Sequence, residues 1–457
     1  MRWMWLASTV LFGLASSLVA AESDKPAWKA AAAKQKITPT EPMFMAGYAS
    51  RTKPSEGVAL DLFAKALVLE DALGQQQAIV TLDLIGVPRS LRERLEKQIA
   101  DQFQWKPESL FINASHTHCG PELRVSRLEE SGIESDRTAQ AQAYTANLER
   151  TIVDLLRDCR SRLTPAKLGY SHARCGFAMN RRLPTPSGYQ NSPYPDGPVD
   201  HDVPVLRVDS PDGKQLHAIL FGYACHNTTL SFQQFCGDYA GFAQQALEEA
   251  HPGTTALFVL GCGGDQNPYP RGQLEQCQQH GRSLASAVEA ALLPTSKPLT
   301  GPLSRAIDVA VLQFAPPASR DELQKQAESK SRFEASHAKR LLRQLDEDGK
   351  IPLEYPALTQ VIRFGSDLTL IAMSGEVVVD YSLRLKRELG NENVWVAGYS
   401  NDVFGYVPSQ RVLKEGGYEA GGAMLYTSFP GPFAEDVEER LIAGIRALLE
   451  KTRSARK

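Results

Sequence analysis

The sequence predicts an α/β protein with a mixed sheet flanked by helices and a metal site at the ends of strands. Three observations support this prediction. Short apolar runs alternate with segments of helical spacing along most of the chain. Histidines and a glutamate stand directly after three of the apolar runs. The 457 residues are 42% hydrophobic and 23% charged, which is enough apolar material for a large core.

The first half of the chain alternates strand-like and helix-like segments. A turn signal at Ala72-Leu73-Gly74 separates two apolar runs that we expect to be neighbouring strands. Leu91, Leu95 and Ile99 recur at intervals of four, which predicts a helix. The elements expected here are strands over 64–70, 77–85 and 110–114, and helices over 90–103 and about 139–162.

The second half continues the same succession, which favours a mixed sheet over separate all-α and all-β regions. The stretch 185–198 is rich in proline and glycine and is expected to be a long surface loop. The basic tail 451–457 is expected to be a frayed end. The remaining elements expected are strands over 203–208, 216–224, 256–260 and 368–373, and helices over 239–250, 273–292, 319–345 and 378–389.

Charge excludes some functions, and the N-terminus predicts export. Lys plus Arg number 50 against 53 Asp plus Glu, and no basic run accompanies this balance, so nucleic acid is not an expected partner. Arg2, the apolar run 5–19 and the small residues before Glu22 predict a signal peptide over 1–21 and a mature domain over 22–457. An uncleaved anchor is the alternative, but the run is short for a span of roughly 20 residues. The mature protein is expected in the periplasm or released.

The seven cysteines contain no CxxC pair, which excludes a zinc ribbon and a thioredoxin-type motif. In an oxidising compartment some of them are expected to form disulfides, and the odd number leaves at least one unpaired.

The strongest local motif is His116-Thr117-His118, which follows a buried-looking strand. Side chains two apart at a strand end point to the same side, so the pair suits two metal ligands, or one ligand and one acid/base group. A core or capping role for one of the histidines is the structural alternative. His226 and Glu376 also stand where apolar strands give way to polar residues. Ligands of open α/β sheets gather beyond the carboxyl ends of the strands. The structural alternatives are a hydrogen-bonded core histidine and a glutamate placed by a helix dipole.

A glycine-rich segment, 261–268 (GCGGDQNP), follows a further strand. Its backbone N–H groups could hold an anion or a developing oxyanion, and a tight turn is the plain alternative. It lacks the GK[ST] of a phosphate-binding loop, and no GxSxG elbow exists in the chain, so a Ser-His-Asp hydrolase is disfavoured.

Two histidines, a carboxylate and an open position are typical of a catalytic zinc site. Zinc would acidify a bound water and polarise a carbonyl. A different ligand set would use the thiolates of Cys119, Cys225 and Cys262, each beside a motif, but export would expose such thiols to oxidation.

Taken together, these segments resemble the neutral/alkaline, non-lysosomal ceramidase family. The resemblance spans about residues 35–450. It rests on the segments 115–121 (SHTHCGP) and 374–376 (SGE), on His226, on Tyr406 with Tyr418, and on 45–48 (MAGY) and 59–71 (ALDLFAKALVLED).

In that family zinc is held by two histidines, a glutamate and a tyrosine, so the resemblance implies the ligands His116, His226, Glu376 and Tyr406. It also implies that His118 transfers protons or donates hydrogen bonds beside the metal. Tyr418, twelve residues after Tyr406, corresponds to a second active-site tyrosine. Arg181 of Asn180-Arg181 corresponds to an arginine that lines the site, and the adjacent Arg182 is the alternative.

Two departures from the family's pattern bear on function. Family ceramidases carry Gly-Asp-x-Ser-Pro in the glycine loop, whereas this chain has Asn267 at the serine position. An amide cannot act as an alkoxide nucleophile, so we expect water to attack and Asn267 to orient substrate or donate to the oxyanion. The sequence also stops soon after Arg446, where ceramidases generally continue into an immunoglobulin-like domain that is expected to be missing here.

The sequence therefore predicts an exported zinc hydrolase of amide C–N bonds, with ceramide or another N-acyl lipid as substrate and peripheral contact with membrane lipid. Another amide, such as an N-acyl amino sugar or a peptide, is the second candidate. A non-catalytic lipid- or glycan-binding protein with a structural zinc is the candidate from another class, and Asn267 is its best support.

Overall fold

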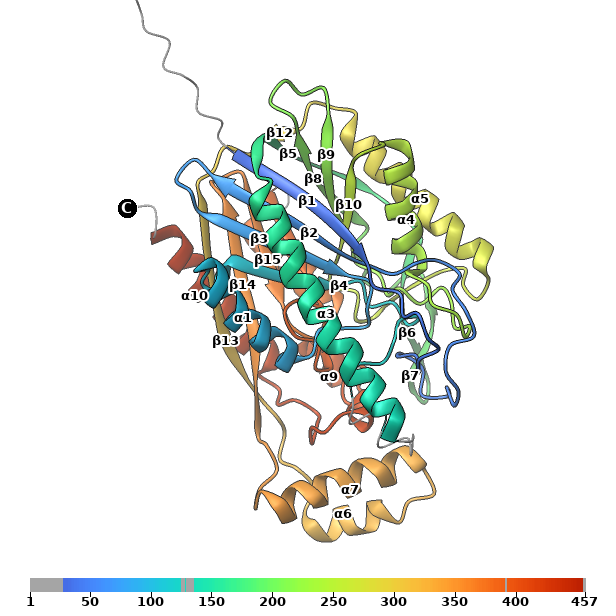
Figure 1. Ribbon diagram of the computed structural model, residues 1–457. Coiled ribbons are helices and arrows are strands. Elements are labelled where there is room, and N and C mark those ends of the chain that lie inside the picture. The colour runs from blue at the N-terminus through green and yellow to red at the C-terminus, as the bar shows by residue number, and fades with distance from the viewer. Residues whose placement is uncertain (1–27, 125–127, 129–134, 391–392, 455–457) are drawn as a thin grey trace, which may run out of the picture.

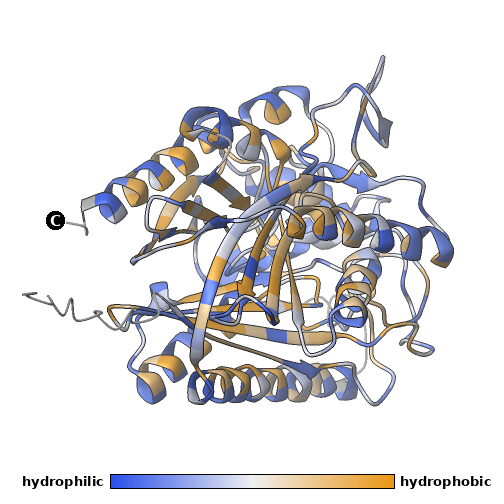
Figure 2. Cartoon of the chain, turned by 90° about the horizontal axis from the view of Figure 1, so that it is seen from above, coloured by the Kyte–Doolittle hydropathy of each residue, from blue (hydrophilic) through white to orange (hydrophobic). Residues whose placement is uncertain are grey.

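The computed structural model describes residues 28–124, 128, 135–390 and 393–454. The expected signal peptide lies outside these residues. Two stacked sheets form the centre of the molecule, and helices cover the outer face of each (Figures 1 and 2). This is the α/β architecture with a mixed sheet that the sequence predicts.

The larger sheet has the strand order β10-β9-β8-β5-β1-β2-β3-β4, with β12 also paired to β5. The pairs β9–β10 and β3–β4 are parallel, and the other pairs are antiparallel. Its strands are β1 (Trp28–Lys36), β2 (Phe63–Asp71), β3 (Gln76–Leu82), β4 (Leu110–Ala114), β5 (Thr164–Arg174), β8 (Asp202–Asp209), β9 (Leu216–Tyr223), β10 (Thr255–Leu260) and β12 (Lys297–Pro298).

The smaller sheet has the order β13-β14-β15-β17. It comprises β13 (Leu303–Gln313), β14 (Glu354–Phe364), β15 (Leu368–Met373) and β17 (Val394–Ala397). Two short pairings stand near the strand ends: β11 (Gln266–Pro268) adds to β6 (Ala178–Thr185) and β7 (Gly188–Tyr194), and β16 (Glu376–Val377) pairs with β18 (Tyr406–Val407).

Alternate residues of β2 show why this sequence builds two layers of core. Ala66 and Val68 pack into the cluster beneath the helices, whereas Leu67 and Leu69 pack into the cluster between the two sheets. Because both faces of the strand are covered, its central residues are apolar without interruption. Trp395 of β17 belongs to the same inter-sheet cluster.

Helices on opposite sides complete four layers. On the larger sheet lie α1 (Arg89–Phe103), α3 (Ser135–Ser161), α4 (Asp238–Ala250) and α5 (Leu274–Leu292). On the smaller sheet lie α8 (Val379–Leu389) and α10 (Val437–Ser454). Shorter elements are η1 (Pro107–Ser109), α9 (Gln410–Glu415) and η3 (Gly422–Tyr426). The frayed end expected from 451 is wrong as far as Ser454, because α10 continues to that residue.

The single helix expected over 319–345 is wrong, because the segment forms the helical hairpin α6 (Arg320–Ala327) and α7 (Arg332–Glu347), which projects from the body in Figure 1. Ser319 and Ser331 each accept a hydrogen bond from the backbone N–H of a glutamate three residues later. The second serine therefore caps a new helix instead of continuing the first.

The surface loop expected over 185–198 is also wrong. Strands β6 and β7 form a hairpin there, with Pro186-Ser187 at the turn and Gly188 at a φ of 113°. Of the described strands only β6 pairs with β7, so β7 is an edge strand that tolerates the proline and polar residues which resemble a loop.

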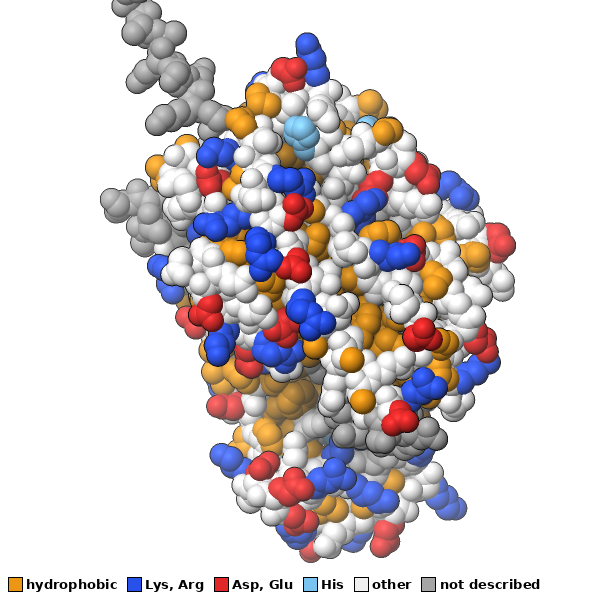
Figure 3. Space-filling view, viewed as in Figure 1, with side chains coloured by type: hydrophobic (Ala, Val, Ile, Leu, Met, Phe, Trp, Pro, Cys, Tyr) orange, Lys and Arg blue, Asp and Glu red, His pale blue; other side chains and the backbone are white. Residues whose placement is uncertain are grey.

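The seven cysteines are all buried free thiols, so the disulfides expected from the sequence are not formed in this structure. Within the described ranges, no helix combines the length and apolar character that crossing a membrane requires. Acidic and basic side chains are interspersed over the face seen in Figure 3.

Candidate active site

The predicted site residues meet where strands of both sheets end. His116 follows β4 by two residues, and His226 follows β9 by three. Glu376 begins β16, just after β15, and pairs in parallel register with Tyr406 of β18. The metal site at strand ends that the sequence predicts is therefore assembled from four separate segments.

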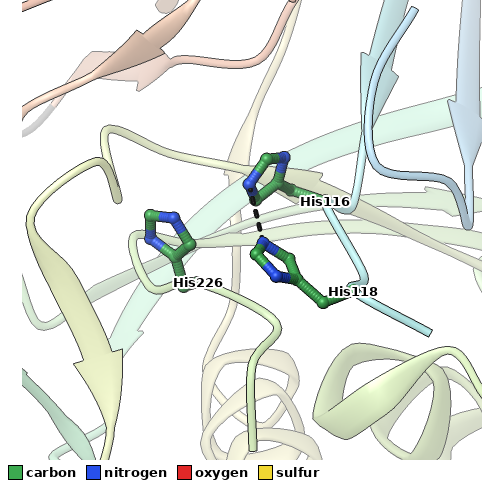
Figure 4. A group of neighbouring side chains, drawn as sticks. All are labelled: His116, His118 and His226. Carbon is green, nitrogen blue, oxygen red and sulfur yellow. Dashed lines mark hydrogen bonds between the residues drawn. The ribbon is translucent and has the colours of Figure 1, made fainter. Parts of the chain in front are cut away.

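The ligand atoms of these side chains face one another. Glu376 Oε2 lies 3.1 Å from His116 Nε2 and 3.3 Å from His226 Nε2. The Tyr406 hydroxyl is 3.2 Å from His226 Nε2. His118 Nε2 is 3.1 Å from His116 Nε2, and the three histidines point toward one another in Figure 4. The trio His116, His118 and His226 could hold a metal ion. The set implied by the resemblance shares His116 and His226 with this trio, and its Glu376 lies within 3.3 Å of both.

Backbone carbonyls fix the orientation of two imidazoles. His116 Nδ1 lies 2.5 Å from the Ile85 carbonyl oxygen, and His226 Nδ1 lies 2.6 Å from that of Gly263. A proton on each Nδ1 satisfies these contacts and leaves the Nε2 lone pair directed into the site. This arrangement is usual for metal-ligating histidines.

Burial also keeps two of the imidazoles, those of His118 and His226, neutral. Burial first, and Arg181 second, lower the pKa of His226 to about 4. Burial likewise places the pKa of His118 well below its ordinary value. Burial alone would raise the pKa of Glu376, but His116 and His226 outweigh it and hold that pKa well below its usual range. The site thus presents neutral imidazoles at His118 and His226 and an ionised carboxylate at Glu376.

The donor set fits a divalent cation. Three buried polar atoms of the site have no hydrogen-bond partner within the described part of the chain: Glu376 Oε2, His118 Nδ1 and the Tyr399 hydroxyl. Lone pairs of a carboxylate and two imidazoles repel one another unless a cation lies among them, and nitrogen with oxygen ligands suits zinc.

Arg181 links the ligand tyrosine to the glycine loop. Its Nη2 donates to the Tyr406 hydroxyl at 3.0 Å, and its Nη1 donates to Asn267 Oδ1 at 3.3 Å. Its Nε donates to Glu419 at 2.7 Å, and all three partners are nearly or fully buried. Arg182 instead contacts Glu419 and Glu415, so of the two arginines it is Arg181 that contacts the predicted ligand Tyr406.

Asn267 occupies the position expected from the sequence. It is 1% exposed, and its Oδ1 also accepts from the Thr228 hydroxyl at 3.2 Å. The glycine loop before it packs tightly, since a side chain at Gly264 would lie 2.6 Å from the Glu376 carbonyl oxygen. The loop therefore carries Asn267 into the group of predicted residues.

An open cavity of about 250 Å³ leads to the ligands. Tyr418 stands in its wall with its ring centre 5.3 Å from that of Tyr406. Desolvation and the nearby Glu376 raise the pKa of Tyr418, so its hydroxyl stays protonated and can donate. A smaller neighbouring cavity of about 70 Å³ shares His116, Glu376 and Arg124 with it. Its other walls combine the charged Glu122 with apolar residues, which are Ile85, Pro88, Leu123, Val403 and Phe404.

Gly47 explains why a glycine stands in the segment 45–48. Its φ is 102°, and a Cβ there would lie 2.5 Å from Cγ of His118. The absence of a side chain is thus required both by the backbone and by the imidazole.

Two residues of the site were missed from the sequence. Tyr399 is fully buried with its ring centre 4.6 Å from that of His116, and it follows β17, so the strand-end rule could have found it. Glu419 pairs with Arg181 from a loop and carries no comparable signal. Cys119, Cys225 and Cys262 are outside the histidine group, and burial raises the pKa of each thiol, so the thiolate set is not supported.

Comparison with known proteins identifies the fold and the family. The chain is similar to the neutral ceramidase of Pseudomonas aeruginosa, with a TM-score of 0.71 and 18% identity over 94% of this chain and 75% of that one. The chain is also similar to a structure described as ceramidase complexed with C2, with a TM-score of 0.71 and 16% identity over 94% of this chain and 76% of that one. These likenesses show the fold. A profile described as neutral/alkaline non-lysosomal ceramidase, N-terminal, matches residues 31–290, more than half of the chain. The protein therefore belongs to the neutral/alkaline non-lysosomal ceramidase family.

Proposed function

We propose that this protein is an exported, zinc-dependent hydrolase that cleaves the N-acyl amide bond of ceramide or a related N-acyl lipid. Family membership supports the coarser statement, a ceramidase-like hydrolase of amide bonds. The observation that supports the finer one is the approach of His116 and His226 to Glu376 Oε2 at an open cavity, with the Tyr406 hydroxyl beside His226.

His116, His226, Glu376 and Tyr406 would hold the zinc. When bound, zinc supplies Lewis-acid polarisation of the scissile carbonyl and lowers the pKa of water. His118 is left as a neutral imidazole beside the ligands, able to accept a proton at Nε2 as water adds to the carbonyl carbon. The same proton then passes to the leaving nitrogen as the C–N bond breaks.

Tyr418 and Arg181 act on charge that develops at the carbonyl oxygen. The protonated Tyr418 hydroxyl donates from the cavity wall. Arg181 keeps Tyr406 in place and, through Asn267, fixes the glycine loop. Preorganised donors of this kind lower the barrier most where water is excluded.

The apolar part of the smaller cavity's wall supports an acyl substrate. Because this cavity shares His116 and Glu376 with the polar cavity, a chain lying along Val403 and Phe404 would bring its carbonyl to the metal ligands. The polar cavity would take the hydroxyl-bearing base.

The test is fatty-acid release from ceramide by purified mature protein, with and without a zinc chelator. We expect release that disappears on chelation and returns with zinc, and no release by Glu376→Ala. N-acyl amino sugars and N-acyl peptides are assayed in parallel. Turnover of these substrates and not of ceramide would show that the substrate is another amide and not an N-acyl lipid. Protein that retains zinc and turns over none of them would favour the non-catalytic binding function.

Export is tested separately by N-terminal sequencing of the protein from the periplasm and the medium. We expect a mature chain that begins near Glu22. A full-length chain starting at Met1 and confined to the cytoplasm would contradict export.

A further inference from the structure

We propose that a second binding site, for a phosphate group, lies at the end of the larger sheet away from the metal ligands. It is an open cavity of about 530 Å³, within the size range of small-molecule sites. Its walls include Gln76, Trp105, Lys106, Glu108, Arg160 and Arg305.

The cavity is separate from the candidate active site. Gln76 and Ser109 stand at the N-terminal ends of β3 and β4, whereas His116 follows the C-terminal end of β4. The seven residues of β3 span roughly 20 Å at about 3.3 Å per residue. Nothing bound in this cavity would touch the predicted zinc ligands.

Arg305 is the residue that points to a ligand. Its Nε and Nη1 atoms are buried and have no hydrogen-bond partner among the residues that the structure describes. Glu108 and Asp71 act on Arg305 electrostatically, and Asp71 already accepts from the backbone N–H groups of Leu73, Gln75 and Leu303. Buried guanidinium donors are normally matched by an acceptor, so an acceptor is missing from this wall.

Charge identifies the class of that acceptor. The lining contains three cationic side chains and one carboxylate, that of Glu108. The cationic residues are Lys106, Arg160 and Arg305. Arg160 uses its Nε to donate to Gln76 at 3.2 Å and lies over the Phe103 ring, which keeps its guanidinium on the wall. Two guanidinium groups with a lysine are the usual partners of a phosphate dianion, which they contact through paired hydrogen bonds.

The cavity is larger than a phosphate ion needs. Trp105 is fixed on the wall by its indole N–H, which donates to Gln76 at 2.8 Å, and its ring lies 5.0 Å from that of Phe103. A phosphate monoester therefore fits better than the free ion, with its organic part beside Trp105. The inference does not depend on the proposed activity.

The experiment is a titration of the full chain with inorganic phosphate, glycerol 3-phosphate, or phosphatidylcholine vesicles that contain phosphatidic acid. Trp105 fluorescence and thermal unfolding are the readouts, against potassium chloride at equal ionic strength. We expect saturable changes with at least one phosphate source, and the strongest source distinguishes a soluble ester from a lipid headgroup.

Three variants test the assignment. Arg305→Gln should weaken binding by roughly tenfold or more, because it removes charge-assisted hydrogen bonds. Lys106→Gln, at an exposed position that should not disturb folding, should weaken it by roughly threefold. Arg174→Gln, an exposed arginine outside the cavity, should change nothing. Absence of saturation with all three sources, or equal binding by wild type and both cavity variants, would overturn the proposal.

Discussion

Arg181 and Tyr406 are joined by a hydrogen bond of 3.0 Å, although 225 residues separate them in the chain. The guanidinium donates to the hydroxyl oxygen that we assign to the metal, and Glu419 holds the same guanidinium from the other side at 2.7 Å. The buried ion pair of Arg181 with Glu419 thus sets the position of Tyr406, and Glu419 acts on it through Arg181. Glu419 is therefore a positioning residue.

Glu419→Gln should lower kcat by roughly tenfold with little change in KM, because substrate does not touch residue 419. It should also destabilise the fold by about 3 kcal/mol, since it leaves buried arginine charge uncompensated. Steady-state kinetics and urea unfolding measure the two effects. Glu415→Gln, which removes the carboxylate that contacts Arg182 and Arg411, is the matched control and should keep kcat.

His116→Ala and Glu376→Ala should each weaken zinc binding by more than roughly 100-fold, because loss of even an outer partner costs 10–100-fold. Metal content after dialysis is the measurement. His280→Ala is the control, since that histidine contacts the Pro270 carbonyl away from the site. Full zinc occupancy in either ligand variant would refute the assignment.

His118→Ala separates the two ligand sets that the geometry allows. If His118 moves protons and does not bind the metal, this variant keeps its zinc and loses roughly 100-fold or more in kcat. Loss of zinc together with activity would instead place His118 among the ligands, with His116 and His226.

Asn267→Ser restores the residue that family ceramidases carry in the glycine loop. We expect kcat/KM for ceramide to stay within roughly tenfold of wild type, since water attacks in both proteins. Asn267→Ala removes the acceptor that Arg181 and Thr228 share, so its kcat/KM for ceramide should be lower than that of the serine variant. Activity that appears only in the serine variant would show that residue 267 takes part in the chemistry and that the natural chain is a binding protein.

Gly47→Ala should displace His118 and lower activity, because the new Cβ would overlap the imidazole. A cost of about 1–3 kcal/mol in stability accompanies the unfavourable φ. Gly74→Ala is the matched control: its φ is also positive, at 76°, but no atom lies within 4 Å of the added Cβ. Equal kcat in the two variants would rule out the contact as the cause.

Asp265 makes stability depend on pH. Burial raises its folded pKa to about 6 from the ordinary 3.8, so folding favours the protonated form. The stabilising contribution is complete below about pH 3.8 and is lost as the pH rises through about 6, by about 3 kcal/mol. Urea unfolding between pH 4 and 7 should show this decline in wild type relative to Asp265→Asn. Parallel profiles of the two proteins would contradict it.

Strand ends made much of the site predictable. The sequence predicts His116, His226 and Glu376 as site residues because each follows an apolar run. In the structure Glu376 Oε2 lies within 3.3 Å of Nε2 of both histidines. Tyr399 also follows a strand, but a tyrosine in such a place looks like a core residue. Glu419 could not be predicted from the sequence, because its role depends on contacts with Arg181 and Arg182, which are 238 and 237 residues away in the chain.

Strand β1 is absent from the elements predicted from the sequence, for a different reason. Strand β1 contains four consecutive alanines, whose intrinsic preference is helical. It is extended because β2 pairs with it along its whole length, from Trp28 opposite Asp71 to Lys36 opposite Phe63. Long-range pairing decides the conformation there, and no local pattern reports it.

The four implied ligands divide evenly along the chain: His116 and His226 precede the turn at Leu293, which is 87% exposed, and Glu376 and Tyr406 follow it. Cleavage at that turn would give two fragments with half of the donor set each. With these four ligands, neither fragment could chelate zinc as the intact site does, whereas the trio His116, His118 and His226 lies entirely in the first fragment. Both fragments would leave the inter-sheet cluster uncovered. With the four implied ligands, co-expressed halves would regain metal only by docking, so zinc retention would serve as a split-protein reporter of their reassembly.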